Sequence, residues 1–390
     1  MKSRYKVLFL ASWYPNKYND IEGIFIKNHA HAISKYTNVI VLYIRSIEQK
    51  GNLDSDKYEI SISLEDEIKT IRIYFKKSNG KFKNIFNSFR YFKAIHLGLK
   101  TIKAEFGDPD IVHLNVAAIP MGIIALFYKY AKNKKYVLTE HWTGYTELDG
   151  NFKKQSKLRQ FLIRKIIKNA CCVTTVSSSL KNAMQKLGMK NKYFIIPNVI
   201  EGENVRLKEP NSKKRIVSCS TLSKQKNIFD IIKAVNVILE DRNDFELHII
   251  GDGDEKEKLE QLSDDLGLRN KVVFFHGLMP NSEVLKFMAN SDFLVLNSNF
   301  ETFSVVTAEA LACGIPVIAT KSGGPEEFVN SDVGILIEPK NQEQLIIAIK
   351  YMLDNHMKYD PTKLHEYAMK RFNNEIIGKN FLDVYAQFFN

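Results

Sequence analysis

The chain has 390 residues, of which 45% are hydrophobic, enough apolar material for two cores of ordinary domain size. Its longest apolar run, residues 117–128, is shorter than the roughly 18 residues that a membrane-spanning helix requires, so we expect no such helix. Residues 1–200 carry 34 Lys and Arg against 15 Asp and Glu, whereas residues 201–390 carry 22 against 29, so a basic half precedes a mildly acidic one.

Strands alternate with helical patterns along the first half, which is typical of a parallel sheet wound with helices. The chain begins with a strand over residues 5–11, a loop over 13–23 and a helix over 24–36. The pattern then predicts a helix over 178–188 and strands over 38–44, 68–75, 110–115, 135–141, 171–177 and 193–198. These elements predict a first domain over residues 1–198.

Residues 198–215 are polar and lack periodicity, so we interpret them as a linker. The pattern after them predicts strands over 215–220, 245–253, 272–277, 293–298 and 316–320, and helices over 227–240, 255–267, 281–290 and from about Ser304. The predicted fold class is therefore α/β, with two tandem Rossmann-like parallel-sheet domains facing an interdomain cleft. Ligands are expected beyond the carboxyl ends of the strands.

Three basic segments, residues 76–103, 129–135 and 153–168, hold much of the excess positive charge. Aromatic and aliphatic residues alternate with Lys and Arg in these segments, a combination that suits an anionic membrane surface. The alternative is a lysine-rich proteome whose solvated helix faces happen to be basic. No nucleic-acid partner is expected, because the sequence contains no zinc-ligand spacing or other nucleic-acid recognition module.

The segment ETFSVVTAEALACG places Glu301 before a predicted helix and Glu309 inside it. Ser304 is expected to cap this helix, whose free N–H groups and dipole would form a seat for phosphate. Glu309 has mostly apolar neighbours, where an unpaired carboxylate is costly, so it requires a partner such as the hydroxyl pair of a sugar. The alternative is that Glu301 pairs with the helix dipole while Glu309 faces solvent.

The same segment resembles the paired-glutamate motif of the retaining glycosyltransferases of family 4, which have the GT-B fold. Residues 310–329, ALACGIPVIATKSGGPEEFV, resemble that family's small-residue helix, Gly-x-Pro-Val strand and Gly-Gly-x-x-Glu segment. Residues 245–262 resemble its strand, Gly-Asp-Gly turn and helix, and residues 272–298 resemble the segment that runs past the nucleotide base. The resemblance covers almost the whole chain.

The resemblance implies that residues 199–374 form the domain that binds a nucleotide-sugar and that residues 1–198 bind the acceptor. A last helix, at about 375–390, is expected to pack back on the first domain, as in this fold generally. Glu309 is expected to hold the ribose. The donor sugar and diphosphate are assigned to Glu301 and to the backbone of the residues that follow it, Thr302, Phe303, Ser304 and Val305.

Three further residues are assigned by the resemblance. Lys226 matches the lysine that neutralises the leaving diphosphate, whereas Thr221 stands where the family has an arginine, so either Lys224 supplies the second charge or Lys226 and the helix dipole act alone. His141 follows a strand, where the family keeps a histidine near the donor sugar and the reacting carbon. Gly23 matches a glycine of the N-terminal loop and would allow the backbone to approach phosphate or acceptor closely.

No catalytic metal and no cofactor are expected. The segments DSD (54–56), DPD (108–110) and DGD (252–254) imitate a metal-binding Asp-x-Asp, but DGD lies in a turn of the family and the other two lack a supporting context. Gly-Asp-Gly also resembles half of a dinucleotide-binding fingerprint, yet no strand is followed by a full GxGxxG.

We therefore expect a retaining hexosyltransferase with His141, Lys226 and Glu301 as catalytic residues. The donor is expected to be a UDP-sugar, with a GDP-sugar as the alternative. The acceptor is expected to be a lipid-linked glycan or polyprenyl diphosphate in capsule, exopolysaccharide or lipopolysaccharide synthesis. Two other functions stay open: a sugar-nucleotide epimerase of the same fold, and a non-catalytic nucleotide-sugar-binding scaffold.

The sequence also predicts a cytoplasmic protein, peripheral on the inner face of the cell membrane. The first apolar run is short for a signal peptide. The four cysteines, Cys171, Cys172, Cys219 and Cys313, have no metal-binding spacing and are interpreted as reduced core residues.

Overall fold

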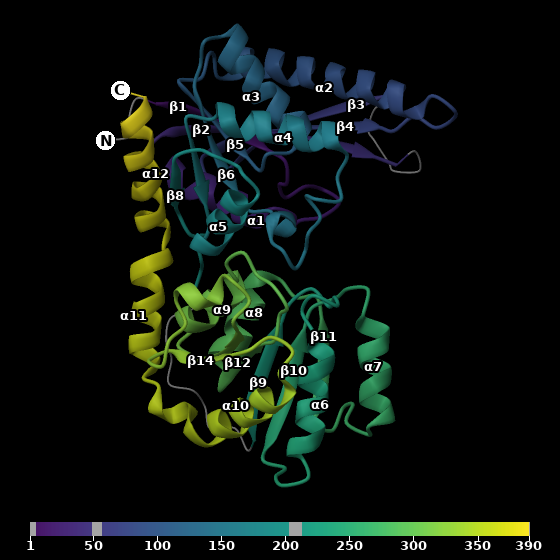
Figure 1. The fold of residues 1–390 in the computed structure, drawn as a ribbon, viewed down its shortest axis with the longest axis vertical. Helices are drawn as coiled ribbons and strands as arrows, with labels where there is room; N and C mark the ends of the chain where they lie inside the picture. Colours follow the sequence, from purple (N-terminus) through teal and green to yellow (C-terminus); the bar gives the residue numbers. More distant parts are fainter. Residues whose placement is uncertain (1–4, 49–56, 203–212, 390) are drawn as a thin grey trace.

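The computed structural model describes residues 5–48, 57–202 and 213–389, which form two domains, each built around one sheet (Figure 1). The DSD segment at 54–56 and residues 203–212 of the predicted linker lie outside the described residues. The predicted fold class is confirmed, because both sheets are predominantly parallel and wound with helices.

The first domain contains one eight-stranded sheet. Its strands are β1 (Lys6–Ala11), β2 (Asn38–Ile47), β3 (Tyr58–Glu65), β4 (Ile68–Lys76), β5 (Ile111–Asn115), β6 (Tyr136–Glu140), β7 (Cys172–Thr175) and β8 (Tyr193–Ile195). Their order is β3-β4-β2-β1-β5-β6-β7-β8, and only β3 runs antiparallel to its neighbour. The prediction missed β3, although its polar and apolar residues alternate strictly, as in a half-buried edge strand.

Helices cover both faces of this sheet, because the side chains of a strand alternate between its two faces. The helices are α1 (Ile24–Ser34), α2 (Lys83–Glu105), α3 (Ile119–Ala131), α4 (Lys157–Asn169) and α5 (Ser178–Lys186), with a short 3-10 turn, η1 (Thr143–Tyr145). Leu8 and Leu10 of β1 share a buried cluster with α2, α3 and α4. Val7 and Phe9 point to the opposite face, which is covered by α1 and by the last helix, α12 (Asn374–Phe388).

The second domain contains a six-stranded, all-parallel sheet. Its strands are β9 (Lys214–Cys219), β10 (Phe245–Ile250), β11 (Val273–Gly277), β12 (Phe293–Leu296), β13 (Val317–Thr320) and β14 (Gly334–Ile337). Their order is β11-β10-β9-β12-β13-β14. The helices are α6 (Ile228–Ile238), α7 (Lys256–Asp265), α8 (Asn281–Ala289), α9 (Val305–Ala312), α10 (Gln342–Asn355) and α11 (Pro361–Phe372), with 3-10 turns η2 (Pro325–Glu327) and η3 (His356–Lys358). The prediction did not include β14, α10 or α11.

The chain passes between the domains twice, and the two passages touch. The Ile200 N–H, just after the first domain, donates to the Phe372 carbonyl at the end of α11, at 3.1 Å. From there α12 runs back along the first domain beside α1 (Figure 1). The packing is close, because a Cβ added at Gly378 would lie 2.4 Å from the Ala32 carbonyl oxygen.

A membrane-spanning helix was not expected from the sequence. In the described part of the chain, no helix is both long and apolar enough to cross a bilayer.

We predict that Tyr385→Phe destabilises the first domain by about 1–3 kcal/mol, the cost of leaving a buried polar group without its partner. The Tyr385 hydroxyl lies 2.6 Å from Nδ1 of the buried His113, whose other ring nitrogen already contacts the Thr139 hydroxyl at 2.5 Å. A lower midpoint of urea unfolding measures the effect. Tyr351→Phe, on the exposed side of α10, is the matched control, and equal midpoints for the two variants would contradict the prediction.

Candidate active site

Lys226 and Glu301 form an ion pair where two loops of the second domain meet. Lys226 follows β9 and Glu301 follows β12, which are adjacent strands of the sheet. Lys226 Nζ lies 2.5 Å from Glu301 Oε1, and both side chains are largely buried, with 18% and 10% of their surface exposed. The carboxyl ends of two parallel strands thus bring together residues that are 75 positions apart in the sequence.

Backbone and amide hydrogen bonds join the same two loops. The Asn299 N–H donates to the Gln225 carbonyl at 2.8 Å, and the Gln225 side chain donates to the Phe300 carbonyl at 2.8 Å. The Asn299 side chain donates to the Lys224 carbonyl at 3.1 Å. The position of Lys226 relative to Glu301 is therefore fixed by the loops and not by the ion pair alone.

A third loop pairs with the Glu301 backbone. The Glu301 N–H donates to the Ser322 carbonyl at 2.8 Å, and the Gly324 N–H donates to the Glu301 carbonyl at 3.2 Å. A Cβ added at Gly324 would lie 2.5 Å from the Phe303 backbone, so only glycine allows this approach. The Gly-Gly segment noted in the sequence thus lies directly against Glu301.

Ser304 does not cap α9 with its side chain, and this corrects the prediction. It occupies the N-cap position with a φ of 74°, a left-handed conformation that is uncommon outside glycine. Its hydroxyl lies 2.7 Å from the Thr307 hydroxyl and not on a backbone N–H. The N–H groups of the first turn, at Val305 and the residues after it, are therefore not used by a side-chain cap and could bind an anion.

The residues between Glu301 and α9 also contribute to the packing of the second domain. Phe303 is buried, and its ring contacts Phe328 at 5.3 Å and Phe372 at 5.2 Å between centroids. Thr302 and Val305 are partly exposed. Their backbone, rather than their side chains, is what the sequence assigned to the donor.

Glu309 lies on the buried side of α9, with 8% of its surface exposed, so it does not face solvent. Burial raises its pKa to about 8, and the negative charge of Glu201 acts in the same direction, whereas an interaction with the Asn281 side chain opposes them. Burial likewise raises the pKa of the Cys219 thiol; the negative charge of Glu309 raises it further, whereas the positive charge of Lys226 lowers it. Glu309 and Lys226 thus both act on the Cys219 thiol, which places the Glu309 carboxyl near Lys226.

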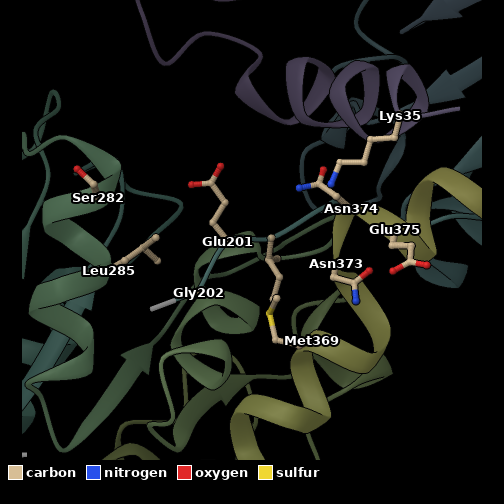
Figure 2. A pocket seen from close by; sticks show the side chains of 10 residues that line it. Lys35, Glu201, Gly202, Ser282, Leu285, Met369, Asn373, Asn374 and Glu375 are labelled. Atoms are coloured by element: carbon tan, nitrogen blue, oxygen red, sulfur yellow. The ribbon is translucent and has the colours of Figure 1, made fainter. Parts of the chain in front are cut away.

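A cavity of about 500 Å³ lies where the two interdomain passages meet (Figure 2). The residues lining it come from both domains and from both passages: Lys35, Ile200, Glu201, Gly202, Ser282, Leu285, Met369, Asn373, Asn374 and Glu375. Glu201 projects into this space in Figure 2. Because the Glu201 charge also affects Glu309, the cavity adjoins the buried end of the site.

His141 is buried at the carboxyl end of β6 in the first domain. Neither of its ring nitrogens has a hydrogen-bond partner among the described residues. Its ring contacts Phe25 at 4.6 Å and His29 at 5.3 Å between centroids. Burial holds its pKa well below the usual value and the neighbouring histidines lower it further, whereas an interaction with the Asn198 side chain opposes them, so the ring is neutral near pH 7.

Glu140, which the sequence analysis did not single out, shapes the loop that carries His141. Its buried carboxyl group accepts hydrogen bonds from the N–H groups of Ala117 at 3.0 Å, His141 at 3.0 Å and Trp142 at 3.1 Å, and from the Tyr145 hydroxyl at 3.1 Å. The one sequence signal that could have identified it is an acidic residue at the end of an otherwise apolar strand.

Gly23 begins α1 with a φ of 66°, and a Cβ at this position would lie 2.5 Å from the Trp13 carbonyl. Phe25, two residues on, is the ring that contacts His141, so the glycine loop and His141 are neighbours. Glu22, beside Gly23, forms an ion pair with Arg45.

The structure does not bring all the predicted residues into contact. Lys226 contacts Glu301, and Phe25, two residues after Gly23, contacts His141, but no hydrogen bond among the described residues connects the two groups. Thr221 and Lys224 are both exposed, and the Lys224 charge acts on Glu255, whose pKa it helps to lower. The described geometry therefore gives Lys226, not Lys224, the contact with Glu301.

The Asp-x-Asp segments that the structure describes are engaged in other contacts. Asp252 accepts a hydrogen bond from the Gly253 N–H and pairs with Lys256, and Asp110 accepts one from the Lys6 N–H. Across residues 5–48, 57–202 and 213–389, no group of three or more His, Cys, Asp or Glu side chains is arranged to hold a metal ion.

Two Rossmann-like domains, with the Lys226–Glu301 pair at the strand ends of the second, define a two-domain enzyme of the GT-B class. The chain belongs to glycosyltransferase family 4. Residues 199–371 match the family model described as glycosyl transferases group 1, and residues 61–203 match the model described as glycosyltransferase family 4.

Relatives and solved structures agree with this assignment. The chain is 30% identical over 298 residues to N-acetyl-alpha-D-glucosaminyl L-malate synthase of Bacillus anthracis, covering 72% of this chain and 76% of that protein. It is 28% identical over 344 residues to N-acetylgalactosamine-N,N'-diacetylbacillosaminyl-diphospho-undecaprenol 4-alpha-N-acetylgalactosaminyltransferase of Campylobacter jejuni, covering 85% and 90%. The fold matches HepE of Anabaena in complex with UDP, with a TM-score of 0.70 at 17% identity over the whole of both chains.

We predict a pH-dependent stability that Glu309 causes. Its pKa of about 8 in the folded chain lies above the value of about 4.3 in an unfolded one, so the folded protein holds this proton more tightly. The contribution of that proton to the free energy of unfolding is complete below about pH 4 and is lost as the pH rises through 8. Glu309→Gln should therefore gain in Tm over the wild type as the pH rises from about 5 to 8.5. Thermal unfolding without ligand measures this difference.

The exposed Glu343 on α10 offers a control, since Glu343→Gln should track the wild type at every pH. A difference between Glu309→Gln and wild type that stays constant over this pH range would show that Glu309 is already ionised in the folded protein.

Proposed function

We propose that this protein is a retaining, metal-independent glycosyltransferase that moves a hexose from a nucleotide-sugar to a lipid-linked acceptor. The donor is a UDP-sugar, with a GDP-sugar as the alternative, and no cofactor is required. The acceptor is a lipid-linked glycan or polyprenyl diphosphate in bacterial capsule, exopolysaccharide or lipopolysaccharide synthesis. The buried Lys226–Glu301 pair beside the uncapped start of α9 is the observation that carries the proposal.

The departing diphosphate would be stabilised by Lys226 and by the free N–H groups of α9. Negative charge develops on this group as the glycosidic bond breaks, and fixed positive groups lower the barrier most where that charge appears. In the absence of ligand Lys226 is paired with Glu301. Binding of diphosphate would give the lysine a second anionic partner and would leave Glu301 free to accept hydrogen bonds from the donor sugar.

Glu309 and His141 would bind the donor from the two domains. The buried Glu309 carboxyl, ionised on binding, would accept hydrogen bonds from both ribose hydroxyls. His141 is neutral and can donate from one nitrogen and accept at the other, so it suits a sugar hydroxyl near the reacting carbon. The acceptor hydroxyl would enter on the face that the diphosphate leaves, with a phosphate oxygen as base, and we assign no covalent nucleophile.

The names of two similar proteins support the choice of substrates. The Campylobacter jejuni relative is named for transfer to a diphospho-undecaprenol-linked sugar, and the Anabaena structure contains UDP. Peripheral attachment to the inner face of the cytoplasmic membrane fits an acceptor of that kind, because a lipid carrier keeps the reacting glycan at the membrane surface.

The outward side of α2, α3 and α4, here called the α2–α4 face, is the surface that we propose for this attachment. Of the seven phenylalanines that are exposed among the described residues, six lie on these helices or at their start: Phe82, Phe86, Phe89, Phe92, Phe127 and Phe161. Ile85, Ile123, Tyr130 and Leu158 are exposed on the same helices. Figure 1 shows the three helices together on the side of the first domain that faces away from the second.

The composition of α2 divides this face into an apolar part and a basic part. Ala94, Gly98 and Ile102 form its buried stripe. Helical periodicity places the exposed phenylalanines on the opposite side, followed along the helix by Lys93 and Lys100. The three helices contain eleven Lys and Arg against one acidic residue, and in the described chain none of these cations pairs with a carboxylate. A surface that binds a membrane typically combines apolar side chains, which insert between the lipids, with lysines, which contact the lipid phosphates.

Binding of UDP, GDP, ADP, CMP and dTDP, measured by thermal shift, tests the donor site. We expect one nucleotide to raise the Tm of the wild type and Glu309→Ala to abolish the shift. With the matching nucleotide-sugar, Glu301→Gln should lower kcat by about a hundredfold or more, since it weakens a charged contact made at the reacting sugar. Glu343→Gln should behave as wild type in both assays.

No shift with any nucleotide would favour a non-catalytic scaffold. Consumption of the nucleotide-sugar at full rate without an acceptor would favour the epimerase. Transfer rates of Glu301→Gln and Glu309→Ala within a few-fold of wild type would overturn the site assignment.

Flotation with phosphatidylcholine vesicles, with and without phosphatidylglycerol, tests the α2–α4 face. The wild type should float with the anionic vesicles and less at high salt. Phe86→Ser/Phe89→Ser should bind at least about tenfold more weakly, because each buried phenylalanine contributes more than a kilocalorie per mole. Phe229→Ser, at the exposed phenylalanine of the second domain, is the control. Equal flotation with both vesicle types, or of the double variant and wild type, would contradict the proposal.

A further inference from the structure

A loop of the second domain reaches the start of a helix in the first. The Ser179 N–H, in the first turn of α5, donates to Glu327 Oε1 at 2.9 Å, and Ser178 also donates to this carboxylate. The next N–H, at Leu180, is taken by the Ser177 hydroxyl at 3.1 Å. The first turn of α5 is thus capped partly by its own domain and partly by Glu327 of the other domain.

The chemistry of this contact suits a carboxylate. The first N–H groups of a helix have no partner within the helix, and the helix dipole favours negative charge at that end. Burial raises the pKa of Glu327, whereas the hydrogen bonds from Ser179 and Ser178 lower it. In this position the Glu327 carboxylate accepts hydrogen bonds from Ser178 and Ser179, at the start of a helix of the other domain.

The loop that carries Glu327 is fitted closely between α5 and Glu301. A Cβ at Gly323 would lie 2.8 Å from the Ser179 hydroxyl oxygen and 2.9 Å from the Glu301 carbonyl oxygen. The same loop holds the Glu301 backbone from both sides, through Ser322 and Gly324. Displacement of α5 relative to this loop therefore displaces the backbone of Glu301.

We propose that Glu327 is a positioning residue that sets the place of Glu301 by anchoring the glycine loop to α5 of the other domain. Glu301 is then held in its reactive position only while the two domains keep this arrangement. The inference rests on the proposed role of Glu301 at the donor sugar. In the proposed function the nucleotide binds at Glu309 and at the start of α9, and neither has a described hydrogen bond to Glu327 or to α5.

Glu326 provides a matched control in the same loop. Its carboxylate accepts a hydrogen bond from the Gly323 N–H, so it stabilises the loop from within. It forms no described contact with the first domain. A residue that only stiffens the loop and a residue that anchors it across the domains can therefore be compared one position apart.

The test compares Glu327→Ala, Glu327→Gln and Glu326→Ala in steady-state kinetics and nucleotide binding. Glu327→Ala should lower kcat by about tenfold to a hundredfold, the effect of misplacing a group at the reacting centre by about 1 Å, while the nucleotide Kd changes less than about twofold. Glu327→Gln keeps an acceptor oxygen and should recover most of kcat. Glu326→Ala should stay near wild type.

Hydrogen exchange measured by mass spectrometry on the same variants gives a readout that does not require activity. In Glu327→Ala, exchange should increase both at 178–180 and at 299–304, although these segments belong to different domains. In Glu326→Ala, exchange at 178–180 should match the wild type.

Wild-type kcat in Glu327→Ala, or faster exchange at 178–180 without a change at 299–304, would reduce Glu327 to a helix cap and overturn the inference. A loss of nucleotide affinity equal to the loss of kcat would also overturn it. A wild type without any transfer activity would instead contradict the proposed function, and the exchange result would still decide whether Glu327 couples the two domains.

Discussion

The site depends on one buried ion pair, that of Lys226 and Glu301. Two charges with so little exposure lose much of their hydration, and neither would be tolerated there without the other. The loops around Gln225 and Asn299 are hydrogen-bonded to each other, so the two charges are held together by backbone as well as by attraction. The charges of Lys226 and Glu301 thereby compensate each other, and the loops that carry them are held in place by hydrogen bonds that do not involve the two side chains.

The first domain provides a contrasting environment, because its buried titratable groups stay uncharged. Burial lowers the pKa of His29 to about 4 and that of His113 to about 3, and it keeps His141 neutral as well. These rings form a connected row from Phe25 at the site to Tyr385 on α12. The last helix of the chain therefore packs on the same buried layer that supports His141, and the two domains are coupled through this packing as well as through the Glu327 contact.

Much of the positive charge of the first half lies on the outward side of the helices that cover one face of its sheet. One face of the eight-stranded sheet is covered by α1 and α12, and the other by α2, α3 and α4, whose outward side is basic and rich in phenylalanine. So many exposed phenylalanines on adjacent helices are uncommon in a protein surface that no partner covers. The second domain is mildly acidic and has only a single exposed phenylalanine among its described residues, so the two halves of the chain differ in the surfaces that they offer.

The sequence alone determined the two α/β domains, because buried parallel strands need apolar runs, and it pointed to Glu309, because a carboxylate among apolar neighbours needs a partner. The other candidate site residues came from the resemblance to a known family. Besides β14, α10 and α11, the prediction from sequence missed β3 and α2 to α4, whose exposed apolar residues obscure the difference between buried and solvent faces. It also assigned the Ser304 hydroxyl to the wrong hydrogen-bond partner, a backbone N–H of α9, whereas this hydroxyl contacts the Thr307 hydroxyl. Only the tertiary structure decided that Lys226 meets Glu301 across 75 positions and that Glu327 meets Ser179 across 148. Local patterns encode which residues are buried, whereas contacts between loops and domains depend on where the whole chain places them.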